Sequence, residues 1–180
     1  LLWTPAAARR FPGSRELDDD DALPITSWVA DDPDPVDPGA WTLTVDGEVD
    51  RPLALGAEDL RPAAERRAVL DCTSGWYAER EWQGLDLGAL VDAAEPTAGA
   101  AWVTIHSVTG YRWSLPLSEA RGALLATRLS GERLEHGHGY PLRLVAPDRR
   151  GFQWVKWVER VELRRRPDPR QWLAVFVSGF

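Results

Sequence analysis

Short runs of alternating apolar and polar residues, separated by turn residues, constrain the fold of this chain more than any other feature. Residues 41–45 alternate apolar side chains with threonine, which is the period-two pattern of a half-buried strand. The Asp46-Gly47 pair that follows predicts a tight turn into a second strand over residues 48–55. Glycines punctuate five further strand-like runs, at residues 102–108, 111–115, 124–129, 141–145 and 155–163.

Only three segments favour a helix. Residues 58–65 predict a short one, with Pro62 tolerable only near its first turn. Residues 85–94 have apolar side chains at helical spacing and end before Pro96. Residues 117–122 are long enough for one turn. Many strands with a few short helices predict a mainly β, α+β domain.

The length suits one domain with a full core, flanked by an arm and a tail. Residues 1–38 predict an extended arm, because an acidic run at 18–21 and a proline-rich loop at 31–38 disfavour regular structure. The predicted division is an N-terminal arm or linker at 1–21, a domain at 22–166 and an apolar tail at 167–180 that docks on the domain. A chain that starts at Leu1 and lacks methionine is expected to be a fragment, and residues 1–10 fit the end of a membrane segment.

The net charge of −7 argues against nucleic acid and against anionic lipid as the main partner. No stretch approaches the ~18 apolar residues that cross a bilayer. The sequence therefore predicts a soluble domain.

Cys72 is the sole cysteine, so it forms no disulfide within the chain. It follows the β-like residues 67–71 and opens a loop with serine and glycine, where functional side chains are common. A thiolate there is a nucleophile or a soft ligand for a transition metal, and a small buried hydrophobic residue is the alternative. A cysteine protease using His106 or His138 is disfavoured because no family signature surrounds these residues. A zinc site at His136 and His138 is disfavoured because the ligands are too few.

Two later loops combine glycine with a cation. Residues 137–144 hold His138 and Arg143, and residues 151–156 begin with Gly151 and end with Lys156. Arginine and lysine beside flexible backbone suit a phosphate, although an arginine in an alternating strand, such as Arg143, more often lies on the surface. The chain has ten tryptophans, and five of them near these loops serve the core or wall a pocket for a flat heterocycle: Trp76, Trp82, Trp113, Trp154 and Trp157.

The order of these motifs resembles the molybdopterin-binding oxidoreductase domain of the sulfite oxidase superfamily, over roughly residues 22–166. The motifs are a strand hairpin with Asp46-Gly47, Leu70-Asp71-Cys72, a segment with Gly84-Leu85 before a helix, the run at 141–147, and Gly151-Phe152-x-x-Val155-Lys156. The resemblance implies a mainly β fold around one molybdenum–molybdopterin cofactor. It also implies that the Cys72 thiolate is the only protein ligand to molybdenum.

The same resemblance implies roles for the other loops. His138 and Arg143 would hold the pterin and its phosphate, and Ser107 would contact the cofactor. The third loop would add four residues: Gly151, Phe152, Gln153 and Lys156. The arm residues Thr26, Ser27 and Trp28 would lie over the pterin, and the candidates for the pocket rim are Tyr77, Arg80 and Arg112.

One departure bears on the substrate. Eukaryotic sulfite oxidases have an arginine a few residues after the cysteine, whereas residues 73–77 here are Thr-Ser-Gly-Trp-Tyr. The run is more similar to the bacterial methionine sulfoxide reductase catalytic subunit. The resemblance therefore implies oxygen-atom transfer on a small sulfoxide-like substrate. A sulfite-oxidising enzyme of the same fold and a cofactor-free interaction module remain the alternatives.

The chain contains no second redox-cofactor motif, so the resemblance also implies an electron-transfer partner, either a haem protein or a fused membrane domain. The expected setting is a monomeric soluble domain of a bacterial membrane-anchored or cell-envelope protein, with no nucleic acid bound.

Overall fold

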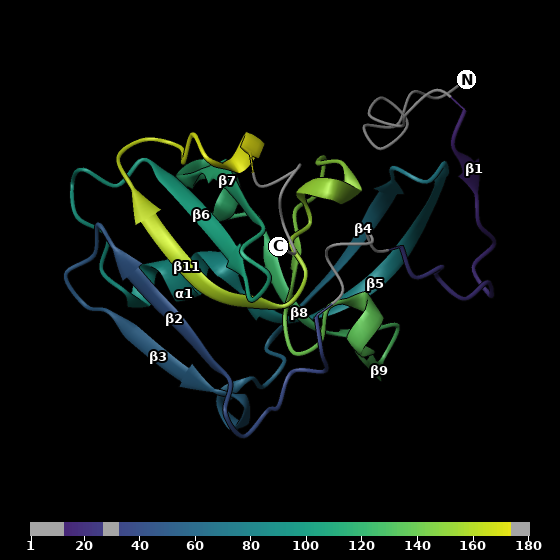
Figure 1. Ribbon diagram of the computed structural model, residues 1–180, viewed down its shortest axis with the longest axis horizontal. Helices are drawn as coiled ribbons and strands as arrows, with labels where there is room; N and C mark the ends of the chain where they lie inside the picture. Colours follow the sequence, from purple (N-terminus) through teal and green to yellow (C-terminus); the bar gives the residue numbers. More distant parts are fainter. Residues whose placement is uncertain (1–12, 27–32, 174–180) are drawn as a thin grey trace.

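Two β-sheets organise the described part of the chain, residues 13–26 and 33–173 of this computed structural model (Figure 1). In the six-stranded sheet, β1 (Arg15–Glu16), β5 (Trp76–Asp86), β8 (Leu124–Leu129) and β10 (Arg143–Val145) follow one another, while β4 (Ala64–Cys72) pairs with β5 and β9 (Glu132–Arg133) pairs with β8. The five-stranded sheet has the order β3 (Leu53–Gly56), β2 (Thr42–Gly47), β11 (Val158–Arg164), β6 (Trp102–Ser107) and β7 (Arg112–Pro116).

Apolar and polar side chains alternate along the strands of the five-stranded sheet, so one face of the sheet is apolar and the other is polar. Val45, Val161, Ile105 and Trp113 form a buried row across four strands. The residues between them point the other way. We call that side the polar face; it comprises Asp46, Thr104, His106, Arg112, Ser114, Arg160, Glu162 and Arg164.

The β4–β5 hairpin carries the end of the six-stranded sheet away from the five-stranded one (Figure 1). Its antiparallel register runs from Ala64 opposite Gly84 to Cys72 opposite Trp76. Directly opposed residues share a face of a sheet, so the Cys72 and Trp76 side chains lie on the same side of the hairpin. On its other edge, β5 pairs in parallel with β1 of the arm.

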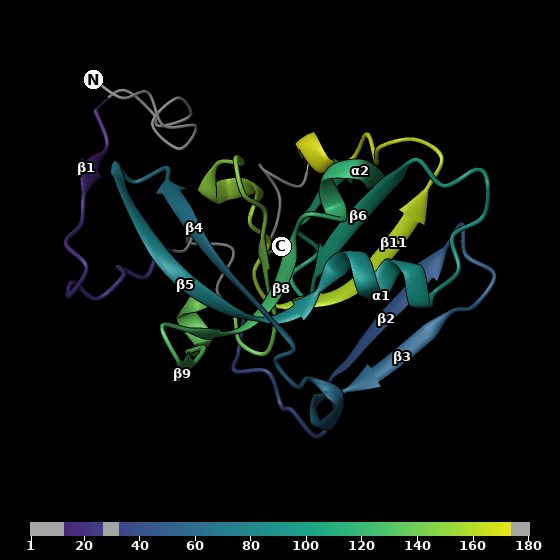
Figure 2. The same ribbon diagram turned by 180° about the vertical axis from the view of Figure 1, so that it is seen from behind.

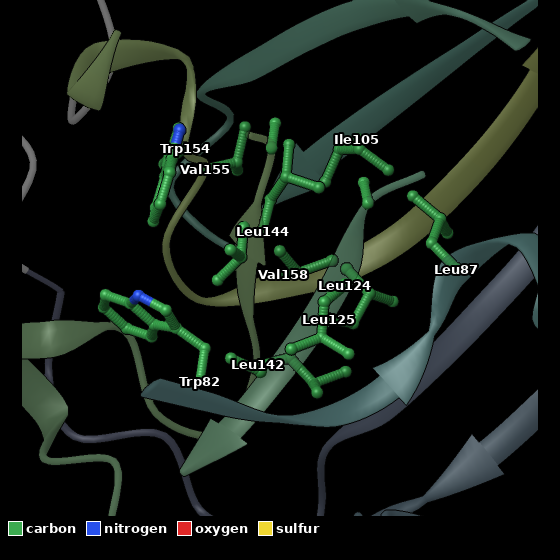
Figure 3. Close-up of a cluster of buried hydrophobic side chains, with 14 of the residues drawn as sticks. Trp82, Leu87, Ile105, Leu124, Leu125, Leu142, Leu144, Trp154, Val155 and Val158 are labelled. Atoms are coloured by element: carbon green, nitrogen blue, oxygen red, sulfur yellow. The ribbon is translucent and has the colours of Figure 1, made fainter. Parts of the chain in front are cut away.

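The core fills the space where the two sheets meet. Leu124 and Leu125 of β8, Leu142 and Leu144 next to and within β10, and Ile105 of β6 are fully or almost fully buried there (Figure 3). Burying each such side chain stabilises the fold by roughly 1.5–3 kcal/mol. Strand β8 therefore holds the cysteine-bearing hairpin to the rest of the domain.

Helices α1 (Leu87–Ala93) and α2 (Leu117–Ala120) are short and directly follow strands β5 and β7. Asp86 is the N-cap residue of helix α1. Its carboxylate accepts a hydrogen bond from the backbone N–H of Ala89 at 2.8 Å, which satisfies one of the free donors at the start of the helix. Helix α1 lies on one face of the five-stranded sheet (Figure 2) and buries Leu87 and Val91. Helix α2 is a single turn.

The predicted mainly β, α+β fold is confirmed, and two local predictions are wrong. Asp46 and Gly47 do not form a tight turn, because both belong to β2 and β3 begins only at Leu53. The N–H groups of residues 50 and 51 instead donate to the carbonyls of Glu95 and Ala94, just after α1. Tertiary hydrogen bonds have therefore replaced the local turn.

The helix predicted over residues 58–65 is also wrong. Only Ala57–Asp59 form a single 3-10 turn, η2, and Ala64 already begins β4. Pro62 offers no N–H to a helix, whereas residues 64–66 gain strand pairs with residues 82–84. Strand β5 is not among the predicted strands, although Trp76, Ala78 and Trp82 alternate with polar residues.

The described ends of the chain both contact the domain. The backbone N–H of Asp168 donates to the Ser114 hydroxyl at 3.0 Å, and the Gln171 side chain accepts from the Ser114 N–H at 2.9 Å. The predicted domain boundaries at residues 22 and 166 stay predictions. Within the described ranges, every helix is too short or too polar to span a membrane. The predicted membrane-like segment at residues 1–10 lies outside them.

Candidate functional site

Cys72 is the last residue of β4 and is buried, with 8% of its surface exposed. Two hydroxyl groups contact its sulfur. Ser74 Oγ lies 3.1 Å from Sγ and Thr26 Oγ1 lies 3.5 Å from it. Ser74 belongs to the loop of the same hairpin, whereas Thr26 comes from the arm, so the arm covers the sulfur.

The loop at Gly151 packs against the end of the cysteine strand. A Cβ at this position would lie 2.8 Å from the Asp71 carbonyl oxygen and 3.2 Å from the Cys72 Cα. The first distance is too short for a Cβ and the second would be unusually tight, so glycine permits the 3-10 turn η4 (Gly151–Gln153) to approach this closely. Strand β4 and η4 thereby bring the first and third sequence motifs together.

The other two residues of that turn have protein partners. Phe152 packs edge-to-face on Trp113, and its carbonyl accepts a hydrogen bond from the Tyr111 hydroxyl. Gln153 is buried, and its side-chain oxygen accepts from the Arg150 N–H at 2.9 Å. These contacts fix the turn, and the structure shows neither side chain bonded to Cys72.

Arg143 is buried in β10 with 5% of its surface exposed, so the surface alternative from the sequence is wrong. Its guanidinium lies beside the rings of Trp82 and Trp154, at 5.5 and 5.9 Å from their centroids, and Nη1 donates to the His138 carbonyl at 3.1 Å. No acceptor for its buried Nε–H is found within residues 13–26 and 33–173. No carboxylate of these ranges forms an ion pair with it either.

The charge on Arg143 survives this burial. Loss of contact with water lowers the pKa of Arg143 to about 10, and the nearby Cys72 sulfur acts in the opposite direction. The guanidinium is therefore still positive at neutral pH. The effect of Cys72 on Arg143 also places the two residues in one electrostatic environment, although they are separated by 71 positions in the sequence.

His138 ends the 3-10 turn η3 (His136–His138) and contacts the arm through Nε2, which lies 3.0 Å from the Leu23 carbonyl oxygen. Burial lowers the pKa of His138, and the charges of Arg143 and Lys156 add to the effect. The imidazole is thus neutral at pH 7. Because a carbonyl only accepts, Nε2 carries the proton, and Nδ1 lies 3.6 Å from the Glu135 carboxylate.

Lys156 also holds the arm. Its ammonium donates to the carbonyls of Thr26 at 2.8 Å and Gly137 at 2.6 Å, and it lies 5.1 Å from the centroid of Trp157. The second and third sequence motifs are therefore tied to residues 23–26. The predicted contacts of Ser27 and Trp28 lie outside the described residues.

Ser107 lies at the end of β6, where its hydroxyl oxygen accepts from the Thr109 N–H at 3.3 Å and from the Thr109 hydroxyl at 3.0 Å. It is linked to the third loop only indirectly, because its own N–H binds the carbonyl of Tyr111, whose hydroxyl reaches Phe152. The structure therefore does not bring Ser107 into contact with Cys72.

The three rim candidates serve the ends of the chain instead. Tyr77 donates to the Glu16 carboxylate at 2.7 Å, and Arg80 donates to the carbonyls of Asp18 and Asp21 at 2.7 and 2.9 Å. Arg112 forms an ion pair with Asp168 at 3.5 Å. Sequence reasoning missed Ser74 as a neighbour of the sulfur; its position two residues after Cys72 in a hairpin loop was the available signal.

Comparison with known proteins bears on the family and the fold of the chain. Residues 30–172 match the family described as the oxidoreductase molybdopterin binding domain. The chain is 32% identical over 137 residues to the oxidoreductase YuiH of Bacillus subtilis, covering 73% of this chain and 69% of that protein. It is 33% identical over 167 residues to MsrP of Gluconobacter oxydans, the catalytic subunit of a protein-methionine-sulfoxide reductase. That match covers 79% of this chain and 54% of MsrP.

Among solved structures, the fold matches the sulfane dehydrogenase SoxCD of Paracoccus pantotrophus with a TM-score of 0.70 and 26% sequence identity. The match covers 74% of this chain and 40% of that one. The chain therefore spans only part of these larger proteins.

Proposed function

Because this chain belongs to the family of oxidoreductase molybdopterin-binding domains, we propose that it holds one molybdenum–molybdopterin cofactor with Cys72 as the sole protein ligand to the metal. The enzyme class, a molybdopterin-dependent oxidoreductase, follows from the family. The ligand, the pterin-binding residues and the substrate are our proposals.

The observation that carries the proposal is the buried positive charge of Arg143, which lies within the electrostatic influence of Cys72. A buried cation is costly unless an anion or hydrogen-bond acceptors satisfy it. The described residues supply one carbonyl and leave Nε–H without an acceptor. A phosphate is the ligand that a guanidinium fork binds best, and a thiolate is the soft donor that a transition metal prefers. The residues present therefore fit a metal cofactor that carries a phosphate.

Each proposed residue then has a defined task. Arg143 and Lys156 neutralise the phosphate, and His138 helps to hold the pterin. Gly151 keeps the third loop close to Cys72, and Phe152 and Gln153 hold that loop in shape. Ser107 is proposed to contact the cofactor because of the resemblance alone. When bound, the cofactor supplies two-electron redox chemistry coupled to oxygen-atom transfer, while the protein orients it and limits access of water.

A small sulfoxide-like molecule is our proposed substrate. The loop at residues 73–76 carries no charged side chain, so an oxyanion such as sulfite would meet no cation there. A neutral sulfoxide needs none. The similarity to MsrP supports this choice, and the similarity to SoxCD supports oxidation of a sulfur compound as the second candidate. Electrons would pass to or from a separate haem protein or a membrane domain.

Elemental analysis of protein purified from its native host tests the cofactor directly. We expect near one molybdenum per chain, together with pterin fluorescence. The Cys72→Ser variant should retain the fold by circular dichroism and lose its molybdenum, whereas the neighbouring Thr73→Ser variant should keep it. Unchanged molybdenum in Cys72→Ser would overturn the ligand assignment, and metal-free native protein would favour the interaction module.

Turnover then separates the substrates. A protein loaded with molybdenum should reduce a small sulfoxide with an artificial electron donor. Faster oxidation of sulfite than reduction of any sulfoxide tested would show that the second candidate is correct.

A further inference from the structure

The two hydroxyl groups at Cys72 form a closed triangle with its sulfur. Sγ lies 3.1 Å from Ser74 Oγ and 3.5 Å from Thr26 Oγ1, and the two oxygens lie 3.1 Å from one another. The Cys72 side chain is buried. The two hydroxyl groups are the hydrogen-bond partners of its sulfur on the described arm and hairpin loop. Such a triangle is compact enough for any of its three atoms to exchange hydrogen-bond partners.

Counting hydrogens shows what the triangle does in each state of the sulfur. With a protonated thiol, each of the three groups has one hydrogen, and each can donate to the next around the ring. A thiolate bound to a metal has lost its hydrogen and can only accept. Both hydroxyl hydrogens can then point at the sulfur, which becomes the single acceptor of the triangle.

Hydrogen bonds to a ligand sulfur withdraw electron density from it and stabilise the more reduced metal. We propose that Ser74 and Thr26 are positioning residues that donate to the ligating sulfur of Cys72 and raise the reduction potential of the metal bound there. This inference rests on the proposed function, because it assumes that Cys72 is the metal ligand.

The two donors are held by independent parts of the fold. Ser74 is fixed by the β4–β5 hairpin, whose last pair is Cys72 and Trp76. Thr26 is fixed through its own carbonyl by Lys156, and the neighbouring Leu23 carbonyl is bound by His138. The arm thus supplies one of the two donors, and the effects of the two residues should add.

The test is a redox titration of the loaded enzyme monitored by the electron paramagnetic resonance of molybdenum. Ser74→Ala and Thr26→Val should each shift the midpoint to lower potential, and the double variant should shift it further. The variants Ser74→Thr and Thr26→Ser keep the hydroxyl, so their reduction potentials should stay close to that of the wild type. Thr73→Ala, an exposed neighbour, is the matched control and should leave it unchanged.

A double variant with the wild-type potential and full molybdenum content would overturn the inference. If these residues had only a structural role, the substitutions would lower the molybdenum content or the stability without a parallel shift of the reduction potential. The hydroxyl-retaining variants would then behave like the variants that lack the hydroxyl.

A second measurement needs no cofactor. In metal-free protein, the infrared S–H stretching band of Cys72 reports the hydrogen bonds at its sulfur, and it should move to higher frequency in the double variant than in the wild type. A band at the wild-type frequency would show that the hydroxyls do not bind the sulfur. If native protein lacks molybdenum, the proposed function fails, while this experiment still decides whether the hydroxyls bind the sulfur.

Discussion

The polar face of the five-stranded sheet and the surroundings of Cys72 both bury charged side chains, but they differ in how those charges are paired. On the polar face, Glu162 lies 3.0 Å from His106, 3.0 Å from Arg164 and 3.4 Å from Arg160. Asp168 is bound by Arg112 and Arg170. Near Cys72, the guanidinium of Arg143 has one carbonyl and no carboxylate among the described residues.

This difference separates a structural cluster from a binding site. Charges that neutralise one another inside a protein hold elements together, and removing one partner leaves the other uncompensated. A buried cation without an anion gives the fold no such benefit, so its role lies in what it binds. On this reasoning the polar face stabilises the domain, and Arg143 is the residue that we propose binds an anionic ligand.

Arg143→Met gives the largest expected effect. It removes the buried charge but keeps an apolar chain beside Trp82 and Trp154. We expect at least a tenfold loss of bound molybdenum, together with an unfolding free energy of the cofactor-free protein that is unchanged or about 1 kcal/mol higher. Metal analysis and urea unfolding measure the two quantities. Arg67→Met, at an exposed arginine, is the control, and a large loss of stability in Arg143→Met would contradict the comparison.

Asp168→Asn should give the opposite result. The change removes the negative charge that Arg112 and Arg170 share, at a buried position. Because both arginines are partly exposed, we expect a loss of about 1–2 kcal/mol in the free energy of unfolding. Molybdenum content per folded chain should stay at the wild-type level. Asp20→Asn in the exposed part of the arm controls for the change in net charge, and a selective loss of molybdenum would show that the polar face also serves the site.

His106 gives the smallest effect and a pH dependence. Burial lowers the pKa of His106, against the opposing hydrogen bond and charge of Glu162. The unfolded chain therefore binds a proton below about pH 6.5 that the folded chain binds only at lower pH, so this residue reduces stability as the pH falls below that value. His106→Gln keeps an N–H donor for Glu162 and binds no proton. We expect the free energy of unfolding, measured in urea between pH 7.5 and 5.5, to fall less steeply for this variant than for the wild type; these pH values lie about one unit either side of the free histidine pKa. The same slope in both proteins would contradict the lowered pKa of His106.

The Glu162 carboxylate acts in a lower pH range. Burial would raise the pKa of Glu162, but hydrogen bonds and charges from Arg164, Arg160 and His106 outweigh it and lower the value. Its stabilising contribution is therefore present above the pKa of an unfolded glutamate and is lost as the pH falls through the folded pKa.

Local patterns predicted much of the fold. Strands β6, β7, β8 and β11 and helix α1 follow from periodicity and from Pro96, because each buries one regular face. The failures are tertiary in origin. The loop after Gly47 bonds to the end of α1, and β5 has the charged Arg80 on its inward face because the arm carbonyls bind it there.

The candidate site was predictable in its members but not in its contacts. Cys72, Arg143 and Lys156 stand out by residue type and loop setting, and the family order adds His138 and Gly151. No local signal shows that Arg143 is buried beside two tryptophans, or that Ser74 and Thr26 meet at the sulfur. Those contacts depend on the hairpin register and on the path of the arm.

The arm's attachment has a consequence for how the domain behaves as a thermodynamic system. Residues 23–26 are bound by His138 and Lys156, which are also proposed to hold the cofactor, and Arg80 secures the arm further back. Two events that share the same contacts must be linked, and linkage is reciprocal. A ligand that steadies these side chains protects the arm from proteases and from hydrogen exchange. If the arm is cleaved, the ligand binds more weakly by the same free energy. The protection of the arm from hydrogen exchange therefore becomes a measure of the affinity for the cofactor.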